Sequence, residues 1–285
     1  MTRHEEQLAA FGQRLRELRQ QAGLTTYSVA DRTELSQSKI SRLETGKLLP
    51  TSGDVESIAA ALDLPYQIRD ELSDEVQQLR TEVTSWRRHA RKGLSTKQKA
   101  VREQERETTL LRGFQPVLVP GLLQLPEYAR SVFTASWWSS PVDVGKAVAN
   151  RIERQAILYE HDRQFEFILT EAALRHTLCS PAVMQAQVGH LITMTRMGNV
   201  RLGVIPFDRL LPANPMHPFW LYDARMVSFE TFSGETLLRD ERDVRLYTQI
   251  FAQFGSVALW GDDARAMLDG LTDEYRHLAS GANST

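Results

Sequence analysis

Residues 35–47 read Leu-Ser-Gln-Ser-Lys-Ile-Ser-Arg-Leu-Glu-Thr-Gly-Lys, and this stretch decides the fold of the N-terminal part of the chain. Ile40 and Leu43 lie three positions apart, so they share one face of a helix. Ser36 suits the N-cap, because its hydroxyl can accept from a free amide of the first turn. Gly46 lies where a helix stops in a left-handed conformation. We therefore predict a short helix with one buried face.

The other face of this helix is polar. Gln37, Ser38, Lys39 and Arg42 can all donate hydrogen bonds, and they lie away from Ile40 and Leu43. A helix that is anchored on one side and presents Gln, Ser and Arg on the other meets the requirements for reading the major groove of DNA. The alternative is a helical cap whose polar face is only solvated.

Three more amphipathic helices are expected around this one. Their apolar residues recur at helical spacing, and they are Leu8, Phe11, Leu15 and Leu18 in the first, Val29 and Ala30 in the second, and Ile58, Ala59 and Leu62 in the fourth. Gly23 ends the first helix and Thr25 can cap the second. Together these segments predict an all-α domain over residues 1–65.

Residues 8–64 resemble the helix-turn-helix domain of the XRE family, the lambda/434-type repressor fold. The resemblance rests on Ala30 at the helix crossing, Leu35 after the turn, Ile40 and Leu43, and the run 41–47 followed by Pro50. The family usually has glycine in the turn where this chain has Glu34. If Glu34 were left-handed, it would cost about 1 kcal/mol.

The resemblance implies roles for individual side chains. Base edges would be read by Gln37, Ser38 and Arg42. DNA phosphates would be held by Thr26, Lys39, Thr45 and Lys47, although Lys39 and Lys47 could equally be ordinary surface lysines. Arg19 and Glu44 match positions that form an internal ion pair in such folds. XRE domains usually bind two-fold symmetric operators as dimers, so double-stranded DNA and a second copy of the chain are the expected partners.

Composition limits the other possibilities. The 285 residues are about twice a typical domain, and the net charge of −2 means that DNA binding must be local and specific. The single cysteine, Cys179, excludes an intramolecular disulfide framework and a cysteine-rich zinc site, and it fits a reducing compartment. No apolar run approaches a membrane span, and the polar N-terminus lacks the core of a signal peptide. We expect a cytoplasmic protein with no cofactor and no metal.

Residues 66–114 are expected to form a helical connector. An apolar stripe of coiled-coil type runs through Ile68, Leu72, Val76, Leu79, Val83 and Trp86. Such a stripe either packs within its own chain or pairs with a second copy. A basic run from Arg87 to Arg112 follows, which is either a solvated helix face or an additional set of salt-sensitive phosphate contacts.

Residues 115–285 are expected to form an α/β or α+β domain. Expected strands are residues 165–169, 200–206, 218–223, 226–230 and 236–238, with helices beginning at Pro126 and Arg151, a helix from Val183 to Met194, and a final helix from Val244 to Phe254. The order of these elements predicts helices packed on a sheet.

This second part resembles the effector-type domain that follows the helix-turn-helix in many actinobacterial regulators. Its best signature is Val119-Pro120-Gly121-Leu122-Leu123-Gln124 followed by Tyr128-Ala129-Arg130, and the segments 151–155, 171–174 and 217–219 agree with it. The resemblance implies a domain that senses a small-molecule effector or binds a small protein from an adjacent gene. It implies no established chemistry.

We do not expect an enzyme. The strand order loosely resembles phospholipase-D-like folds, whose chemistry needs a His-x-Lys pair, but Phe219 stands where the lysine should follow His217. There is also no Walker loop, no Gly-x-Ser-x-Gly and no His-Glu-x-x-His in the sequence. Cys179 has no neighbouring base that would activate it.

Aromatic residues are the candidates for a signal-receiving surface. They are Trp137, Trp138, His217, Phe219, Trp220 and Tyr222. Such residues line ligand pockets and protein interfaces, and they also fill cores. The sequence thus predicts a multidomain, dimeric, sequence-specific transcriptional regulator whose C-terminal domain receives a signal. The alternative is an antitoxin-like protein that captures a small neighbouring-gene product and regulates its own synthesis.

Overall fold

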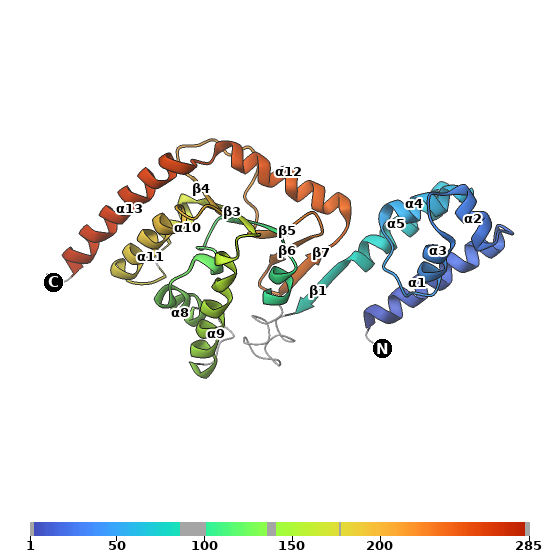
Figure 1. The fold of residues 1–285 in the computed structure, drawn as a ribbon, viewed down its shortest axis with the longest axis horizontal. Helices are drawn as coiled ribbons and strands as arrows, with labels where there is room; N and C mark the ends of the chain where they lie inside the picture. Colours follow the sequence, from blue (N-terminus) through green and yellow to red (C-terminus); the bar gives the residue numbers. More distant parts are fainter. Residues whose placement is uncertain (1–2, 86–100, 136–140, 177, 283–285) are drawn as a thin grey trace. The chain divides into compact units, whose positions relative to one another are not determined.

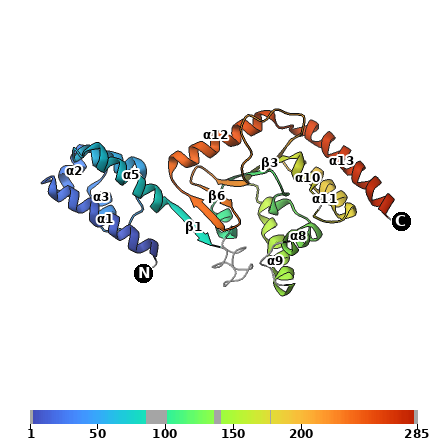
Figure 2. The same ribbon diagram turned by 180° about the vertical axis from the view of Figure 1, so that it is seen from behind.

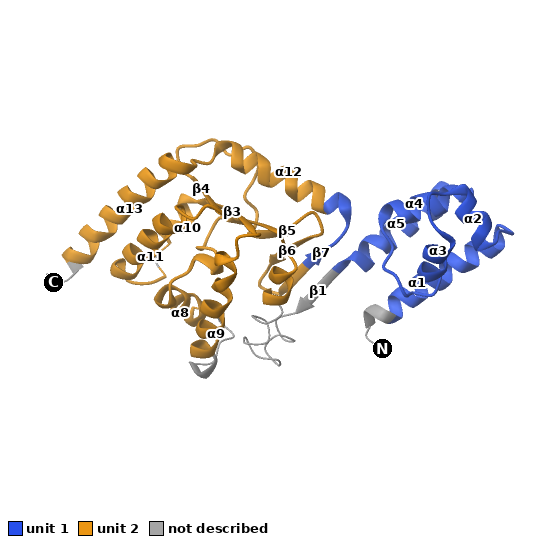
Figure 3. Cartoon of the chain, in the orientation of Figure 1, with its two compact units in different colours: residues 1–83, 237–243 blue, residues 84–236, 244–285 orange. Residues whose placement is uncertain are grey.

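A computed structural model describes residues 3–85, 101–135, 141–176 and 178–282 of the chain. The chain divides into two compact units, shown in blue and orange in Figure 3. Unit 1 comprises residues 1–83 together with residues 237–243, and unit 2 comprises residues 84–236 together with residues 244–285. Unit 1 is therefore discontinuous in the sequence.

The described residues 3–80 of unit 1 form five helices. They are α1 (Arg3–Gln21), α2 (Thr26–Arg32), α3 (Gln37–Glu44), α4 (Ser52–Ala61) and α5 (Tyr66–Arg80). The hydroxyl of Thr25 caps α2, that of Ser36 caps α3, and Thr51 forms a reciprocal capping box with Asp54 at α4. Gly46 has φ +65°, as expected of the residue that ends α3. The predicted all-α fold of this part is confirmed.

One apolar core holds the five helices together. Its buried members come from all of them and are Phe11, Leu15, Val29, Ile40, Leu43, Val55, Ile58, Ala61, Leu62, Leu72, Val76 and Leu79. Leu72 and Val76 of α5 are fully buried in this core. The apolar stripe of α5 therefore packs within its own chain.

The residues of the predicted helical connector, 66–114, belong to several elements of the structure. The helix α5 belongs to unit 1 and ends at Arg80, where β1 (Thr81–Ser85) begins. Residues 101–106 are helical, but the strand β2 (Leu110–Gln115) starts inside the expected connector. A stripe with three- and four-residue spacing looks the same whether it faces a partner helix or its own domain, and here Leu72, Val76 and Leu79 face their own domain. Trp86 lies outside the described residues.

Unit 2 contains a mixed sheet with helices. After β2 its elements are η1 (Gly121–Leu123), α8 (Pro126–Thr134), α9 (Pro141–Arg154), η2 (Gln155–Tyr159), β3 (Gln164–Thr170), α10 (Glu171–Arg175), α11 (Pro181–Met194), β4 (Val200–Ile205), β5 (Phe219–Tyr222), β6 (Met226–Glu230), β7 (Gly234–Leu238), α12 (Glu241–Val257) and α13 (Gly261–Ala282). The strand order is β1-β7-β6-β5-β2-β3-β4. The strands β2, β3 and β4 pair in parallel, whereas β5 is antiparallel to both β2 and β6. This arrangement confirms the predicted α+β class.

Two helices differ from the sequence prediction. We predicted that a helix begins at Arg151. In the structure, the helix that contains Arg151 is α9, which starts at Pro141 and ends at Arg154. Its buried residues Val144, Ala147 and Val148 pack against Phe133 of α8, and their three- and four-residue spacing was the signal that we missed. The helix α12 is not the last one, since α13 follows it.

The two faces of the sheet have different neighbours. Phe114 of β2 stacks on Phe254 of α12, with ring centroids 4.1 Å apart. The preceding residue, Gly113, points to the opposite face, where an added Cβ would lie 2.7 Å from the ring of Trp220. In the views of Figures 1 and 2, α12 lies on one side of the sheet and α8 and α9 lie on the other. No helix among the described residues is both long and apolar enough to cross a bilayer.

Candidate nucleic-acid interface

The helix α3 has the two unlike faces that its sequence predicts. Ile40 and Leu43 are each 1% exposed and belong to the core of unit 1. Ser38 and Arg42 are exposed on the opposite side. Burial of the apolar pair holds the helix in place, because an eight-residue helix is not stable by itself in water. Two of the three base-reading candidates are thus accessible to a ligand.

The third candidate, Gln37, is half-buried at the start of α3. Its Nε2 atom donates to Oγ1 of Thr26, the first residue of α2, over 3.1 Å. The structure therefore brings a base-reading candidate and a phosphate-binding candidate together. This contact leaves one N–H group and the carbonyl oxygen of the Gln37 amide for other partners.

Lys39 has a partner within the protein. Its ammonium group lies 2.7 Å from Oδ1 of Asp54, whose other oxygen accepts from the backbone amide of Thr51. Among the phosphate candidates, Thr45 and Lys47 are exposed. Thr45 donates its hydroxyl hydrogen to the carbonyl of Ser41 over 2.9 Å. Lys39 consequently has a structural role in joining α3 to α4.

An ion pair joins the first helix to the end of α3. Nε and Nη2 of Arg19 lie 2.6 and 2.9 Å from the two carboxylate oxygens of Glu44. The two side chains are only 12% and 8% exposed. The hydrogen bonds to Glu44 outweigh burial and raise the pKa of Arg19 above its usual value. A third bond, from Arg19 to the carbonyl of Leu24, measures 2.7 Å and leaves the guanidinium well satisfied.

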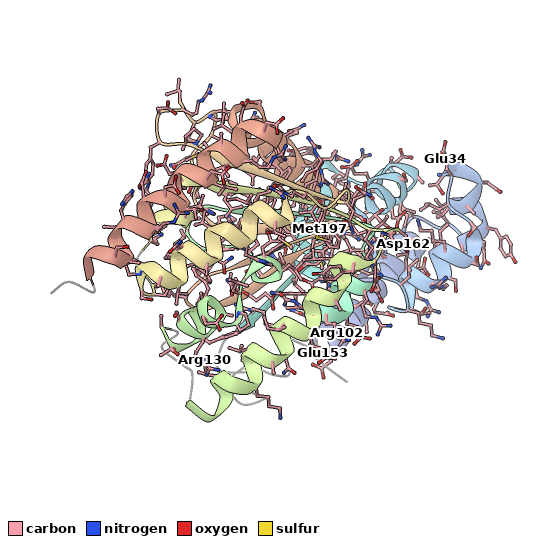
Figure 4. All side chains as sticks on the ribbon, turned by 60° about the vertical axis from the view of Figure 1, so that its left-hand side comes forward. Glu34, Arg102, Arg130, Glu153, Asp162 and Met197 are labelled. Carbon is pink, nitrogen blue, oxygen red and sulfur yellow. The ribbon has the colours of Figure 1, made fainter. Side chains whose placement is uncertain are left out.

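The turn before α3 is unstrained at Glu34. Among the described residues, the only non-glycines with positive φ are Asp63 and Asp223. Glu34 is therefore not left-handed, and the cost considered for a non-glycine at this position does not arise. Figure 4 labels Glu34, which is exposed. The backbone amide of Leu35 instead bonds to the hydroxyl of Thr33 over 3.2 Å.

Two features of this region were missed by sequence reasoning. An added Cβ at Gly12 would lie 2.5 Å from the carbonyl oxygen of Leu43, so only glycine allows α1 to approach the end of α3 so closely. Tyr27, on α2, is 69% exposed. The position of an aromatic residue among the polar residues of α2 could have indicated this exposed side chain.

The segment 237–243 is hydrogen-bonded to α5 within unit 1. Arg80, the last residue of α5, donates through Nε to the carbonyl of Arg239 over 2.7 Å and through Nη1 to the carbonyl of Pro50 over 2.9 Å. Arg242 donates to the hydroxyl of Ser73 over 3.1 Å. The sequence of residues 237–243 contains no local pattern that predicts these contacts.

The aromatic candidates of unit 2 separate into different environments. Trp137 and Trp138 lie outside the described residues. Phe219 is 2% exposed and packs against Phe114 and Phe251, so its role is in the core. Tyr222 is 3% exposed, and burial raises its pKa. Phe219 is therefore a core residue, whereas the buried Tyr222 lies in the wall of a cavity in unit 2.

His217 and Trp220 have defined neighbours as well. The Nε2 atom of His217 lies 3.1 Å from the hydroxyl of Tyr247, and its Nδ1 atom lies 2.9 Å from the carbonyl of Pro218. Both nitrogens are thus engaged in local contacts. Trp220 covers Gly113 and lines a cavity in unit 2.

The basic run is only partly described. Residues 87–99 of this run lie outside the described residues. Arg102 pairs with Glu153 of α9 over 2.6 Å, and Figure 4 shows the two side chains near one another. Arg112 is half-buried on β2 and donates to the carbonyl of Asp223 over 3.1 Å. These two arginines therefore have partners within unit 2.

Comparisons with known proteins agree with the division of the chain. Residues 10–74 match a family described as helix-turn-helix domain, which lies within unit 1. No curated protein matches the chain. Among solved structures, NucT from Helicobacter pylori shares 10% identity and a TM-score of 0.36 over 64% of this chain and 98% of NucT. The archaeal chromatin protein TrmBL2, whose structure is described as showing a novel mode of DNA binding, shares 16% identity and a TM-score of 0.30 over 72% of this chain and 66% of its own.

Neither of these structural similarities is close enough to argue a function. The family match over the second part of the chain is more extensive, because it covers residues 98–270 of the 285. That range contains β2, the Val119–Gln124 segment and most of unit 2. The chain carries a helix-turn-helix domain and belongs to the family described as domain of unknown function DUF5753.

Proposed function

We propose that this protein is a sequence-specific transcriptional regulator of the actinobacterial XRE type, which binds a two-fold symmetric operator as a dimer. The proposal rests on the two unlike faces of α3. Ile40 and Leu43 are buried on one face, and Ser38 and Arg42 are exposed on the other. A short helix held in this way presents its polar side chains to the major groove.

Specificity would come from a few contacts. Arg42 can donate two hydrogen bonds to guanine, and Gln37 can bond to adenine, each such pair contributing about 1–3 kcal/mol of discrimination. The net charge of −2 gives little general attraction to DNA. A dimer compensates for this, because it doubles the number of specific contacts.

Unit 2 would receive the signal. The segment 237–243 supports this proposal, because it is bonded within unit 1 and contains the end of β7 and the start of α12. A ligand that favours one arrangement of this segment would shift the population of DNA-binding states.

A second candidate is the antitoxin-like capture of a small protein. It is favoured by exposed apolar side chains in the loop between β4 and β5, where Phe207 is 66%, Leu210 92% and Met216 82% exposed. Apolar groups gathered in one loop can dock a partner protein. In both candidates the protein acts by binding and not by catalysis.

The test begins with operator selection from random duplexes by the full chain. Replacement of Gln37 or Arg42 by alanine should weaken binding to the selected site by about 1–3 kcal/mol each. Arg276→Ala, which removes an exposed arginine of α13, is the matched control and should leave the affinity unchanged. Unchanged affinity in both α3 variants would reject the reading helix. A chain that is monomeric at micromolar concentration and does not pair on DNA would reject the dimer.

A further inference from the structure

A cavity of about 270 Å³ lies within unit 2, on the face of the sheet opposite α12. Its wall includes the carboxylates of Glu105, Glu230 and Glu235 and the guanidinium of Arg154. The rest of the wall includes Gln115, Gly121, Phe133, Arg151, Trp220 and Ser228. These residues come from β2, η1, α8, α9, β5 and β6, so the cavity forms where distant parts of the sequence meet. Its volume corresponds to about nine water molecules in the liquid. The cavity can therefore hold a small organic molecule.

Arg151 is the distinctive group in this wall. Its Nη1 atom donates to Oε1 of Gln124 over 2.6 Å, and its guanidinium carbon lies 4.0 Å from the ring centre of Phe133. Its Nε atom is buried and has no hydrogen-bond partner. No carboxylate lies within 4.0 Å of Arg151 in the described part of the chain. The Arg151 guanidinium therefore has no carboxylate in direct contact, although Glu230 and Glu105 attract it from a greater distance.

The neighbouring arginine provides a contrast. Nε of Arg154 lies 3.1 Å from a carboxylate oxygen of Glu105, an ion contact in which both side chains are almost fully buried. Burial and, to a smaller extent, repulsion from Arg154 lower the pKa of Arg151 to about 9, against weaker attraction from Glu230 and Glu105. Arg154 is thus balanced by contact with a carboxylate, whereas Arg151 is balanced only from a distance.

The loop that faces these arginines is shaped to fit them. An added Cβ at Gly121 would lie 3.0 Å from Nη2 of Arg154 and 3.4 Å from Nε of Arg151, so the glycine leaves space for both groups. Nε2 of Gln155 donates to the carbonyls of Gly121 and Gln124 over 3.1 and 2.7 Å. Gln124 in turn donates to the carbonyl of Val119 over 2.7 Å. These bonds hold the loop rigidly, and a rigid site loses less entropy when it binds a ligand.

We propose that this cavity binds a small aromatic carboxylate, with its negative group against Arg151 and its ring beside Phe133 and Trp220. A carboxylate matches the geometry of a guanidinium and would supply the partner that Arg151 lacks. The flat apolar side chains of the wall suit a ring more than a hydrated inorganic ion. Binding of this ligand is independent of DNA; its role as an effector rests on the function proposed above.

The experiment titrates benzoate into the full chain without DNA, by calorimetry and by thermal unfolding. Benzamide serves as the neutral analogue of the same shape, and inorganic phosphate serves as an anion without a ring. We expect millimolar or tighter binding of benzoate, at least tenfold tighter than that of either comparison compound, and a matching rise in the unfolding temperature. Equal binding of benzamide or phosphate, or no binding of benzoate, would overturn the proposal.

Variants locate the site. Arg151→Met should weaken benzoate binding at least tenfold, and Arg151→Lys should weaken it less, because lysine keeps the charge but not the paired donors. Arg276→Met removes an exposed arginine and should have no effect. If Arg151→Met does not fold, Gly121→Ala is the test of the site. Its methyl group would crowd the two arginines without removing a charge and should weaken benzoate binding. Benzoate affinity that is unchanged in Gly121→Ala and Arg151→Lys would place binding elsewhere and reject this site. Because no DNA is present, these results are separable from a failure of operator binding.

Discussion

The hydroxyl group of Ser52, the first residue of α4, donates a hydrogen bond to Oδ2 of Asp240, which lies 188 positions later in the sequence. Asp240 is 1% exposed, and its Oδ1 atom accepts from the backbone amide of Arg242 over 2.9 Å. The helix-turn-helix unit is thus completed by a segment that the chain supplies after β7.

Removal of the Asp240 carboxylate should destabilise unit 1. Asp240→Ala leaves the hydroxyl of Ser52 and the amide of Arg242 without their acceptor, at a cost of about 1–3 kcal/mol. Urea unfolding, followed by circular dichroism, measures the change. Asp262→Ala removes a carboxylate that is 95% exposed and should change stability by less than about 0.5 kcal/mol. Equal effects of the two substitutions would show that the Ser52–Asp240 contact contributes nothing.

This contact should also make stability depend on pH. Burial alone would raise the pKa of Asp240, but hydrogen bonds from Ser52 and Arg242 and attraction to the Arg242 guanidinium outweigh it, and the pKa is lowered. The stabilisation is therefore fully present above the unfolded-state pKa of about 3.9 and is lost as the pH falls through the lower folded-state value. The stability difference between the natural chain and Asp240→Ala should shrink below about pH 4. Urea unfolding at a series of pH values measures it, and a constant difference would contradict the assignment.

Asp243 should behave in the opposite way. Burial and repulsion from Asp240 raise its pKa, against attraction to Arg242 and a hydrogen bond from Gln77. Its ionised form is disfavoured in the folded protein, so its destabilising effect is present at neutral pH and disappears as the pH falls below the unfolded-state value. Asp243→Asn should therefore stabilise unit 1 at pH 7 and have less effect in acid. The same unfolding series measures this, and destabilisation at pH 7 would be the contrary result.

The Arg19–Glu44 ion pair should be costly to break. Because both side chains are largely buried, Glu44→Gln leaves a guanidinium without its charged partner, at a cost of about 3–5 kcal/mol. The exposed pair of Arg276 and Asp273 is the control, and Asp273→Asn should cost at most about 1 kcal/mol. Thermal and urea unfolding compare the two. A loss in Glu44→Gln no larger than the control would mean that the pair is not needed to join α1 to α3.

Two glycines of unit 2 should respond oppositely to alanine. An added Cβ at Gly203, on β4, would lie 2.8 Å from the ring of Trp260, so Gly203→Ala should destabilise by about 1–3 kcal/mol. Gly189 lies inside α11 with nothing within 4 Å of its added Cβ, so Gly189→Ala should stabilise by about 0.5–1 kcal/mol. Tryptophan fluorescence during urea unfolding measures both changes. The same sign for both would refute the packing of Trp260 on β4.

Substitution of Lys39 should reduce the stability of the protein, whereas substitution of Lys47 should change operator binding. Lys39→Met breaks the contact with the buried carboxylate of Asp54 and should cost about 1.5–3 kcal/mol of stability. Lys47 is exposed, so Lys47→Met should leave stability unchanged and reduce the salt dependence of operator binding by about one unit of slope. Unfolding and salt-dependent binding assays separate the two roles. A normal salt slope in Lys47→Met would remove it from the phosphate contacts.

Local signals account for what sequence reasoning recovered. The hydroxyl caps at Ser36 and Thr51 and the periodic apolar residues Ile40 and Leu43 act within one helix or one turn. Such interactions depend on neighbours only three or four positions away, so they can be read without the fold. The same reasoning placed β3, β4 and α11 within a few residues.

The sequence by itself thus determined the helix-turn-helix domain, the polar and apolar faces of α3 and the α+β class of the second part. Only the tertiary structure decided that α5 packs into unit 1, that Asp240 reaches Ser52, and that Arg151 faces a cavity beside Trp220. The physical reason is the pairing of β2 with both β3 and β5, strands that follow it at unequal distances along the chain. Non-local pairing of strands brings α9, η1 and β5 around one cavity. Local patterns in the sequence cannot predict that these elements lie close together.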